Sequence, residues 1–110
     1  LLKCQGKGIA ATGHDTPQGF VVRSGSFASK ESVPSLKQHF PKVCDLRDEL
    51  VKNAVLTASG SMLRFTQDYT FSSPSMASSV VLGRPSNGRT EWKDPTGKTL
   101  KQLQEAQAKP

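Results

Sequence analysis

Five side chains between residues 84 and 93 could together contact a nucleic acid. Arginine can donate two parallel hydrogen bonds to phosphate or guanine, asparagine can pair with an adenine edge, and tryptophan can stack on a base. The side chains are Arg84, Asn87, Arg89, Trp92 and Lys93. We take them as a candidate DNA contact. Two plainer interpretations stay open, because Asn-Gly is a common turn dipeptide and the single Trp of a small domain is more often in the core.

A helix that precedes this cluster offers a second candidate site at its beginning. Ser73 is a good N-cap, and Pro74 suits the first helical position, where a missing N–H costs nothing. Free N–H groups, hydroxyls and the positive end of the helix dipole could bind an anion at Ser73 and Ser75. The alternative is that these serines only cap the helix.

The rest of this helix has the pattern of a core element. Met76, Ala77, Val80 and Val81 recur at helical spacing on one face, whereas Ser75, Ser78 and Ser79 point elsewhere. Gly83 can end the helix, because glycine adopts the left-handed conformation without steric cost. We predict that a turn over residues 85–88 then leads into a short strand that carries Trp92.

Two glycine-rich stretches are superficially similar to nucleotide-binding loops. Residues 83–90 approach the G-x-x-x-x-G-K-[ST] pattern, but that mechanism needs a strand before the loop and a helix after it. Here we expect the reverse order, and Arg89 replaces the lysine. Residues 6–11 match G-x-G-x-x-A, but residues 12–17 interrupt any helix there. A bulged or flexible strand end is the favoured interpretation of that stretch.

No residue set points to catalysis, to a metal or to a cofactor. Nucleophile–histidine–acid sets and paired carboxylates are not recognisable, and a zinc site needs about four ligands. Cys4 and Cys44 lie far apart and lack a histidine pattern around them. We therefore expect no enzymatic activity in this chain, and free thiols in a cytoplasmic protein, with a single disulfide as the alternative.

Composition limits the class of protein. A chain of 110 residues with 35% hydrophobic residues predicts one small domain, which we expect to be a monomer. The formal net charge of +6 favours polyanionic partners, although many small domains carry such a charge for solubility alone. We recognise no signal peptide and no apolar run of membrane length in the sequence, and we therefore expect no membrane contact. It does not begin with Met, and we expect it to be part of a longer protein.

Hydrophobic patterning predicts an α+β fold, with short antiparallel strands and hairpins packed on two main helices. Residues 19–25 read as a strand that pairs with one near the N-terminus, and residues 62–66 and 69–71 as two more. Residues 26–42 are polar and predict a long surface loop. Residues 41–53 predict the first helix, with a core stripe of Val43, Leu46, Leu50 and Val51 and with Arg47 on the solvated side.

The C-terminal end of the chain predicts a short helical turn. Thr99 and Gln102 have the spacing of a capping box, and Leu100 and Leu103 could anchor one turn on the core. We expect a single domain over residues 1–103 and a frayed tail over residues 104–110.

The stretch FSSPSMASSVVLGRPSNGRTEWKDPTGKTL, residues 71–100, resembles a small domain of unknown function that is often found C-terminal to a GIY-YIG nuclease domain. That family is similar to the RAMA domain, which accompanies restriction enzymes and adenine methylases. The resemblance extends upstream through residues 19–22, 25–26, 46–50 and 65–69, and so covers about residues 19–100. The family usually has Gly where this chain has Ala54, and it tends to place alanine at positions 78 and 79.

The resemblance and the basic charge imply a non-catalytic accessory domain that contacts DNA and serves a nuclease or restriction-modification protein. Other domains of the parent protein would be its further partners. The GIY and YIG motifs are absent here, so the chemistry of such a parent would lie in another domain. The alternative function is a protein–protein or interdomain docking module without nucleic-acid contact, which an exposed apolar patch away from the basic cluster would favour.

Overall fold

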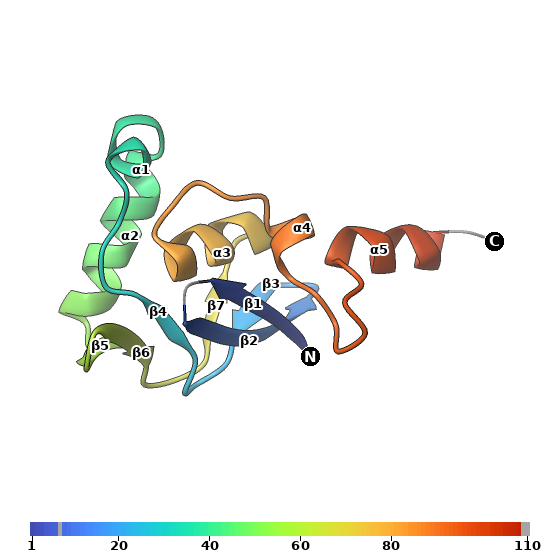
Figure 1. Ribbon diagram of the computed structural model, residues 1–110, viewed down its shortest axis with the longest axis horizontal. Helices are drawn as coiled ribbons and strands as arrows, with labels where there is room; N and C mark the ends of the chain where they lie inside the picture. Colours follow the sequence, from blue (N-terminus) through green and yellow to red (C-terminus); the bar gives the residue numbers. More distant parts are fainter. Residues whose placement is uncertain (7, 109–110) are drawn as a thin grey trace.

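A computed structural model describes residues 1–6 and 8–108 of the chain. Within these residues the protein is one α+β domain with seven short strands in two antiparallel sheets and five helices (Figure 1). The predicted fold class is confirmed. The N-terminal strands, the helix that begins at Pro74 and the C-terminal segment meet on one side of the molecule, and this side holds the candidate residues.

The larger sheet supplies one wall of the core. It contains β1 (Leu2–Gly6), β2 (Ile9–Thr16), β3 (Gly19–Val22) and β7 (Tyr69–Phe71), in the order β1-β2-β3-β7. Alternate residues point inward, so Cys4 pairs with Ala11 and Phe20 pairs with Phe71 inside the core. Ile9 begins a strand rather than a helix, as the favoured interpretation of residues 6–11 requires, although residue 7 lies outside the described residues.

The smaller sheet closes the core from another side. It contains β4 (Phe27–Ser29), β5 (Leu56–Ser59) and β6 (Met62–Phe65), in the order β4-β6-β5. Its inward residues are Ala28, Leu56, Leu63 and Phe65. The Phe65 ring meets that of Phe71 edge to face, with centroids 6.2 Å apart, and so joins the two sheets.

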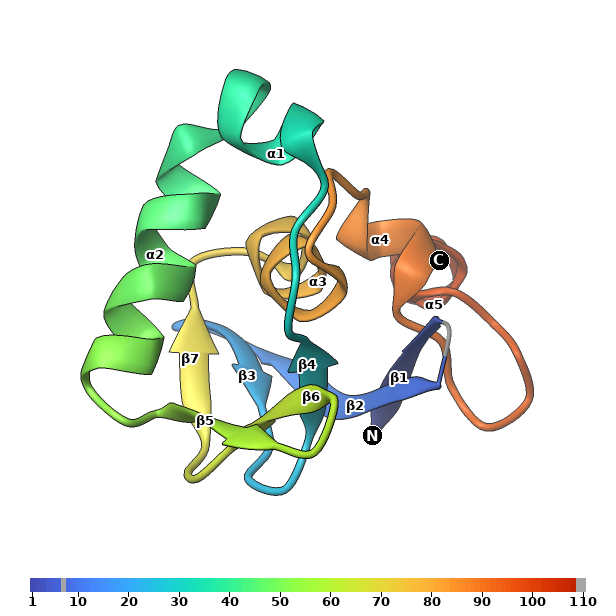
Figure 2. The ribbon, with the colours of Figure 1, turned by 60° about the vertical axis from the view of Figure 1, so that its left-hand side comes forward.

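Helix α3 (Pro74–Leu82) lies at the centre of the domain, surrounded by strands and other helices (Figure 2). Its ends are as predicted: the Ser73 hydroxyl accepts from the Met76 N–H at 3.0 Å, and Gly83 has a φ of 69°. Its faces are not as predicted, because residues 77–82 are all buried, Ser78 and Ser79 included. A helix that is covered on every side has no solvated face, so periodicity gave no signal for its serines.

The loop predicted over residues 26–42 is wrong. This stretch contains β4 and α1 (Pro34–His39), and α2 (Pro41–Lys52) follows after Phe40. Each helix has a proline at its first turn, where the missing N–H is harmless. In α1 only Leu36 is buried, so a single apolar anchor gave no periodicity to read.

Helix α2 matches its predicted bounds but not all of its predicted face. Val43 and Leu50 are buried and Leu46 packs against the core, whereas the Val51 side chain is 47% exposed. Arg47, expected in solvent, is only 6% exposed. After α2, Ala54 has a φ of 60°, so the position where the family usually has Gly does adopt the left-handed conformation.

The segment after α3 also differs from its prediction. Residues expected to form a turn and a strand form α4 (Gly88–Glu91), and Trp92 follows directly as its C-cap. The capping box at Thr99 is confirmed, since the Gln102 N–H donates to the Thr99 hydroxyl and the Thr99 N–H donates to the Gln102 side chain. Helix α5 (Leu100–Ala108) runs past the expected start of a tail at residue 104, and residues 109–110 lie outside the described residues.

Candidate functional site

Trp92 is a core residue and not a stacking platform. Its side chain is 0% exposed, and its ring centroid lies 4.5 Å from that of Phe20. Its indole N–H donates to the carbonyl oxygen of Pro74 at 3.0 Å. A base cannot stack on a ring whose two faces are both covered by the core. The interpretation of Trp92 as a core residue is therefore correct.

The beginning of α3 is covered by α4. The Ser75 hydroxyl accepts from the Gly88 N–H at 2.9 Å, and a Cβ on Gly88 would come within 2.1 Å of the Pro74 carbonyl carbon. Ser73 caps its own helix, as described above. Both candidate anion ligands are thus engaged inside the protein, and the backbone of residue 88 occupies the space in front of Ser75. The capping interpretation fits this geometry.

Hydroxyl groups on the next turn of α3 hold the loop that leads to α4. Ser78 and Ser86 lie within hydrogen-bonding distance of each other at 2.6 Å, and the Ser86 N–H donates to the Ser79 hydroxyl at 3.2 Å. The family tends to place alanine at positions 78 and 79, but in this chain both serines form hydrogen bonds. Asn87 then caps α4, because its side-chain oxygen accepts from the Arg89 N–H at 3.0 Å.

The two arginines of the cluster face different sides of α4. Arg84 lies 3.6 Å from the Glu91 carboxylate, whereas the Arg89 Nε donates to Gln104 of α5 at 2.9 Å. Residues 89 and 91 point about 200° apart around a helix, so their partners lie on opposite faces. Arg84 and Arg89 therefore do not belong to one continuous surface.

Lys93 lies directly opposite Lys3. The two residues exchange both backbone hydrogen bonds, Lys3 N–H to Lys93 O at 2.7 Å and Lys93 N–H to Lys3 O at 3.0 Å. In such an antiparallel pair the two side chains stand on the same face about 5.5 Å apart at Cα. Both lysines are exposed. We call them the Lys3–Lys93 pair. Nothing in the sequence marks residue 93 as the partner of β1.

The Lys3–Lys93 pair borders an open cleft of about 520 Å³. Gln5 lines the same cleft, together with two acidic residues, Glu91 and Asp94. Glu91 faces Arg84, and one Asp94 oxygen accepts from the Thr96 N–H, the Thr96 hydroxyl and the Lys98 N–H. These hydrogen bonds, the Thr96 hydroxyl foremost, hold the pKa of Asp94 below its usual value. Both carboxylates thus have partners of their own.

Comparison with known protein families decides what kind of domain carries this surface. A family model described as "Domain of unknown function (DUF4357)" matches residues 2–104. The chain belongs to this family. No curated protein and no solved structure matches it. The match confirms the resemblance to a domain of unknown function and extends it to the N-terminal strands, which include Lys3.

The Cys4 thiol beneath this surface of the DUF4357 domain is buried, and burial disfavours its thiolate form. Burial, with help from the Glu91 charge and against Arg84 and Lys93, raises the pKa of Cys4 to about 12. A reactive thiol needs the opposite shift. Cys4 and Cys44 are both free, so the disulfide alternative does not hold.

Within the described part of the chain we looked for metal-binding groups and for membrane-spanning helices. Residues 1–6 and 8–108 contain no group of three His, Cys, Asp or Glu side chains that could hold a metal ion. Among their helices, none combines the length and the hydropathy needed to cross a bilayer.

Proposed function

We propose that this domain is a non-catalytic accessory module that contacts DNA through its phosphates, with the contact centred on the Lys3–Lys93 pair. The observation that carries the proposal is the direct opposition of these two exposed lysines. Like charges placed opposite each other on an antiparallel ladder destabilise it. A phosphate between the two ammonium groups would offset that repulsion, and each phosphate contact adds affinity by counterion release.

The geometry favours phosphate contact over base recognition. Of the five candidate side chains, Trp92 is in the core and the Asn87 amide caps α4. Lys93 and Arg89 remain exposed, and Arg84 has only a loose ion pair. Lysine acts on a phosphate as a point charge and carries no sequence information. The expected binding is therefore sensitive to salt and weakly selective for sequence.

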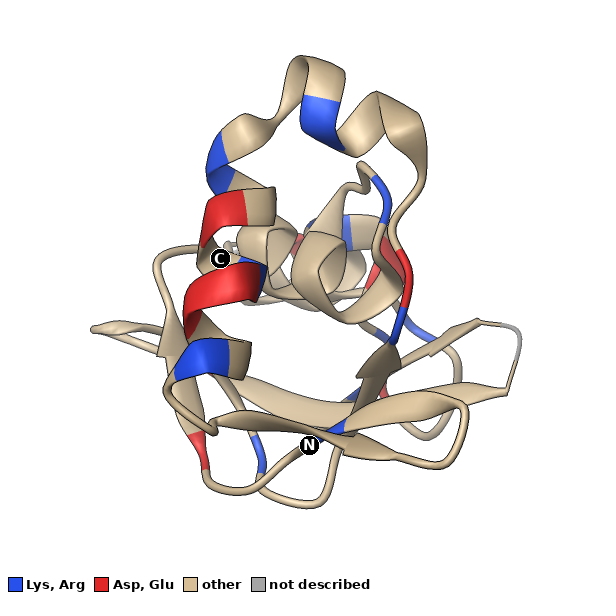
Figure 3. Ribbon diagram, turned by 90° about the vertical axis from the view of Figure 1, so that its left-hand side faces the viewer, with Lys and Arg blue, Asp and Glu red and all other residues tan. Residues whose placement is uncertain are grey.

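The charge of the opposite side supports this location. Three acidic residues of α2, Asp45, Asp48 and Glu49, are all exposed, between the exposed Lys42 and Lys52 near the ends of the helix (Figure 3). A negative surface repels DNA. The net positive charge of the protein is thus not spread evenly, and α2 is the side that we expect to face away from the nucleic acid.

The resemblance to domains that follow GIY-YIG nuclease domains, and to the RAMA domain, supports a nuclease or restriction-modification protein as the parent. In such a protein this domain would hold DNA while another domain acts on it. It would need no cofactor for that role. A cytoplasmic location follows from the same proposal.

A titration of duplex DNA at several salt concentrations tests the proposal. We expect affinity to fall as salt rises, and Lys3→Gln with Lys93→Gln to reduce the slope of log K against log salt by about 2, roughly one unit per lost contact. Lys37→Gln is the matched control, because Lys37 is exposed on α1, far from β1 (Figure 1). Absence of binding at low ionic strength, or an equal effect of the control, would overturn the proposal.

Exposed apolar side chains that flank α1 favour docking to another domain as a second candidate. Phe40 is 48% exposed and Val33 is 40% exposed, on either side of α1. In a parent protein that contains further domains, Phe40→Ser would then loosen interdomain contact, seen as faster amide exchange across α1. Unchanged exchange would count against docking by this surface.

A further inference from the structure

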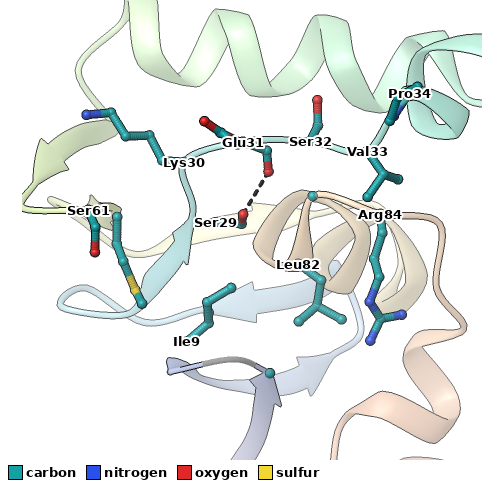
Figure 4. Close-up of a pocket in the computed structure, with 13 residues that line it drawn as sticks. Ile9, Ser29, Lys30, Glu31, Ser32, Val33, Pro34, Ser61, Leu82 and Arg84 are labelled. Atoms are coloured by element: carbon teal, nitrogen blue, oxygen red, sulfur yellow. Dashed lines mark hydrogen bonds between the residues drawn. The ribbon is translucent and has the colours of Figure 1, made fainter.

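Arg84 lines a second cleft, and neither Lys3 nor Lys93 is among its lining residues. Its volume is about 650 Å³, which is within the range of small-molecule sites. Four segments far apart in sequence surround it: the end of the β1–β2 hairpin, residues 29–34, the β5–β6 turn and the C-terminal end of α3 (Figure 4).

Apolar side chains line part of this cleft, beside the polar residues Ser29, Lys30, Glu31, Ser32 and Ser61. Ile9, Met62 and Leu82 contribute side chains from three different elements, and Val33 adds a fourth from the segment before α1. Figure 4 shows Ile9 and Leu82 facing each other across the cleft. Leu82 is already buried and Ile9 and Met62 are half-buried, so a ligand here would remove the remaining exposed surface of Ile9 and Met62 from water.

Hydrogen bonds fix the walls of the cleft to one another, so the cleft is formed before any ligand arrives. The Val33 N–H donates to the Gly83 carbonyl oxygen at 2.8 Å, which fixes residues 29–34 to the end of α3. Gly83 has to be glycine here, because a Cβ would lie 2.4 Å from the Glu31 carbonyl oxygen. At the other end of the segment, the Arg47 guanidinium donates to the Ser29 carbonyl oxygen at 2.6 Å.

A cation lies at the edge of the apolar side chains of this cleft. The Arg84 guanidinium is beside Leu82 in Figure 4, whereas the Glu31 carboxylate points away from Ile9 and Leu82. The Arg84 side chain is 45% exposed, and its ion pair with Glu91 at 3.6 Å is too exposed to hold it firmly. Arg84 can therefore turn both of its terminal N–H groups to an anion.

We propose that this cleft binds a small amphiphilic anion, with its apolar ring or chain against Ile9, Met62 and Leu82 and its carboxylate, sulfonate or phosphate on Arg84. The charge and the apolar side chains together select the ligand class. A purely apolar ligand would make no hydrogen bond to Arg84, and an inorganic anion would leave the apolar side chains in contact with water. This site is separate from the proposed DNA contact, since it uses neither Lys3 nor Lys93, and either proposal can fail without the other.

The test is an NMR titration of the ¹⁵N-labelled protein with naphthalene-1-sulfonate, which has an apolar ring system and one anionic group. We expect saturable shifts of the Ile9, Met62 and Gly83 amide signals, and weaker binding of the neutral naphthalene-1-methanol. Arg84→Gln should weaken sulfonate binding about tenfold, because it removes a charge-assisted contact.

Arg89→Gln is the matched control, since Arg89 is an exposed arginine on the opposite face of α4. It should bind the sulfonate as the wild type does. Shifts scattered over other surfaces, no shift up to the solubility limit, or equal affinities of the two arginine variants would each overturn the proposal.

Discussion

The indole N–H of Trp92 donates to the carbonyl oxygen of Pro74 across 3.0 Å, and this bond joins the end of α4 to the beginning of α3. A second hydrogen bond, from the Gly88 N–H to the Ser75 hydroxyl, joins the same two helices. Together they hold residues 84–93 against the central helix. One consequence is that Trp92 is lost as a base-stacking residue; the other is that Lys93 is placed beside β1.

Replacement of Trp92 by Phe tests this connection. Trp92→Phe removes the hydrogen-bond donor and leaves unfilled volume, so we expect a loss of about 2–4 kcal/mol in the free energy of unfolding. Urea denaturation measures it. Tyr69→Phe is the control, because it keeps a partly buried ring, and it should cost no more than about 0.5 kcal/mol. Equal effects would show that Trp92 is not an anchor.

Arg47 should be among the charged residues whose replacement destabilises the domain most. Its guanidinium is buried and donates to the carbonyl oxygens of Val80 and Ser29, so it joins α2 to α3 and β4. Arg47→Met leaves two carbonyl groups without this donor, and we expect a loss of about 3 kcal/mol. Arg64→Met, at an exposed position of β6, should change stability by about 0.5 kcal/mol or less in the same denaturation series.

Ala54→Gly should stabilise the domain. Alanine at a φ of 60° costs about 1–2 kcal/mol, and glycine adopts this conformation freely at a smaller entropic cost, so we expect a net gain of about 0.5–1 kcal/mol. Thermal unfolding should show a higher midpoint. Ala58→Gly in β5, where the backbone is extended, should lower it. A lower midpoint for Ala54→Gly would contradict a strained alanine at the end of α2.

Cys4 makes stability depend on pH at the alkaline end. Its pKa is about 12 in the folded protein and 9.0 in an exposed thiol, so the unfolded chain loses this proton first. The stability that the protonated Cys4 thiol contributes is fully present below pH 9 and is lost as pH rises from 9 towards 12. Denaturation at pH 8 and pH 11 should show a smaller decline for Cys4→Ala than for the wild type. Cys44→Ala keeps Cys4 and should decline as the wild type does.

Sequence reasoning worked where the signal is local. The ends of α3 follow from Ser73, Pro74 and Gly83, because caps depend only on neighbouring residues. The capping box at Thr99 is the same case. Helix α4 was missed because Asn87-Gly88 was read as a turn, although Asn is also a good N-cap. Helix α1 was missed because one buried residue, Leu36, gives no periodicity.

The site could be predicted only in part, because its contacts join distant segments. Lys93 was a candidate residue, but its partner Lys3 lies 90 residues earlier in the sequence. Arg47 was assigned to solvent by its charge, and its carbonyl partners on β4 and α3 leave no mark in its own neighbourhood. Both cases depend on how the elements pack, which patterning within one helix or strand does not encode.

The most direct test of the central proposal is Lys93→Glu, with stability and DNA binding measured on the same protein. The opposite charge beside Lys3 should raise the free energy of unfolding by about 0.5–1 kcal/mol or more, since it turns a repulsive cross-strand pair into an attractive one. DNA affinity at low salt should fall at least about tenfold, because one phosphate contact is lost and a repulsive charge is added. A stabilised protein with weakened binding is the predicted result. DNA affinity equal to that of the wild type would contradict the account.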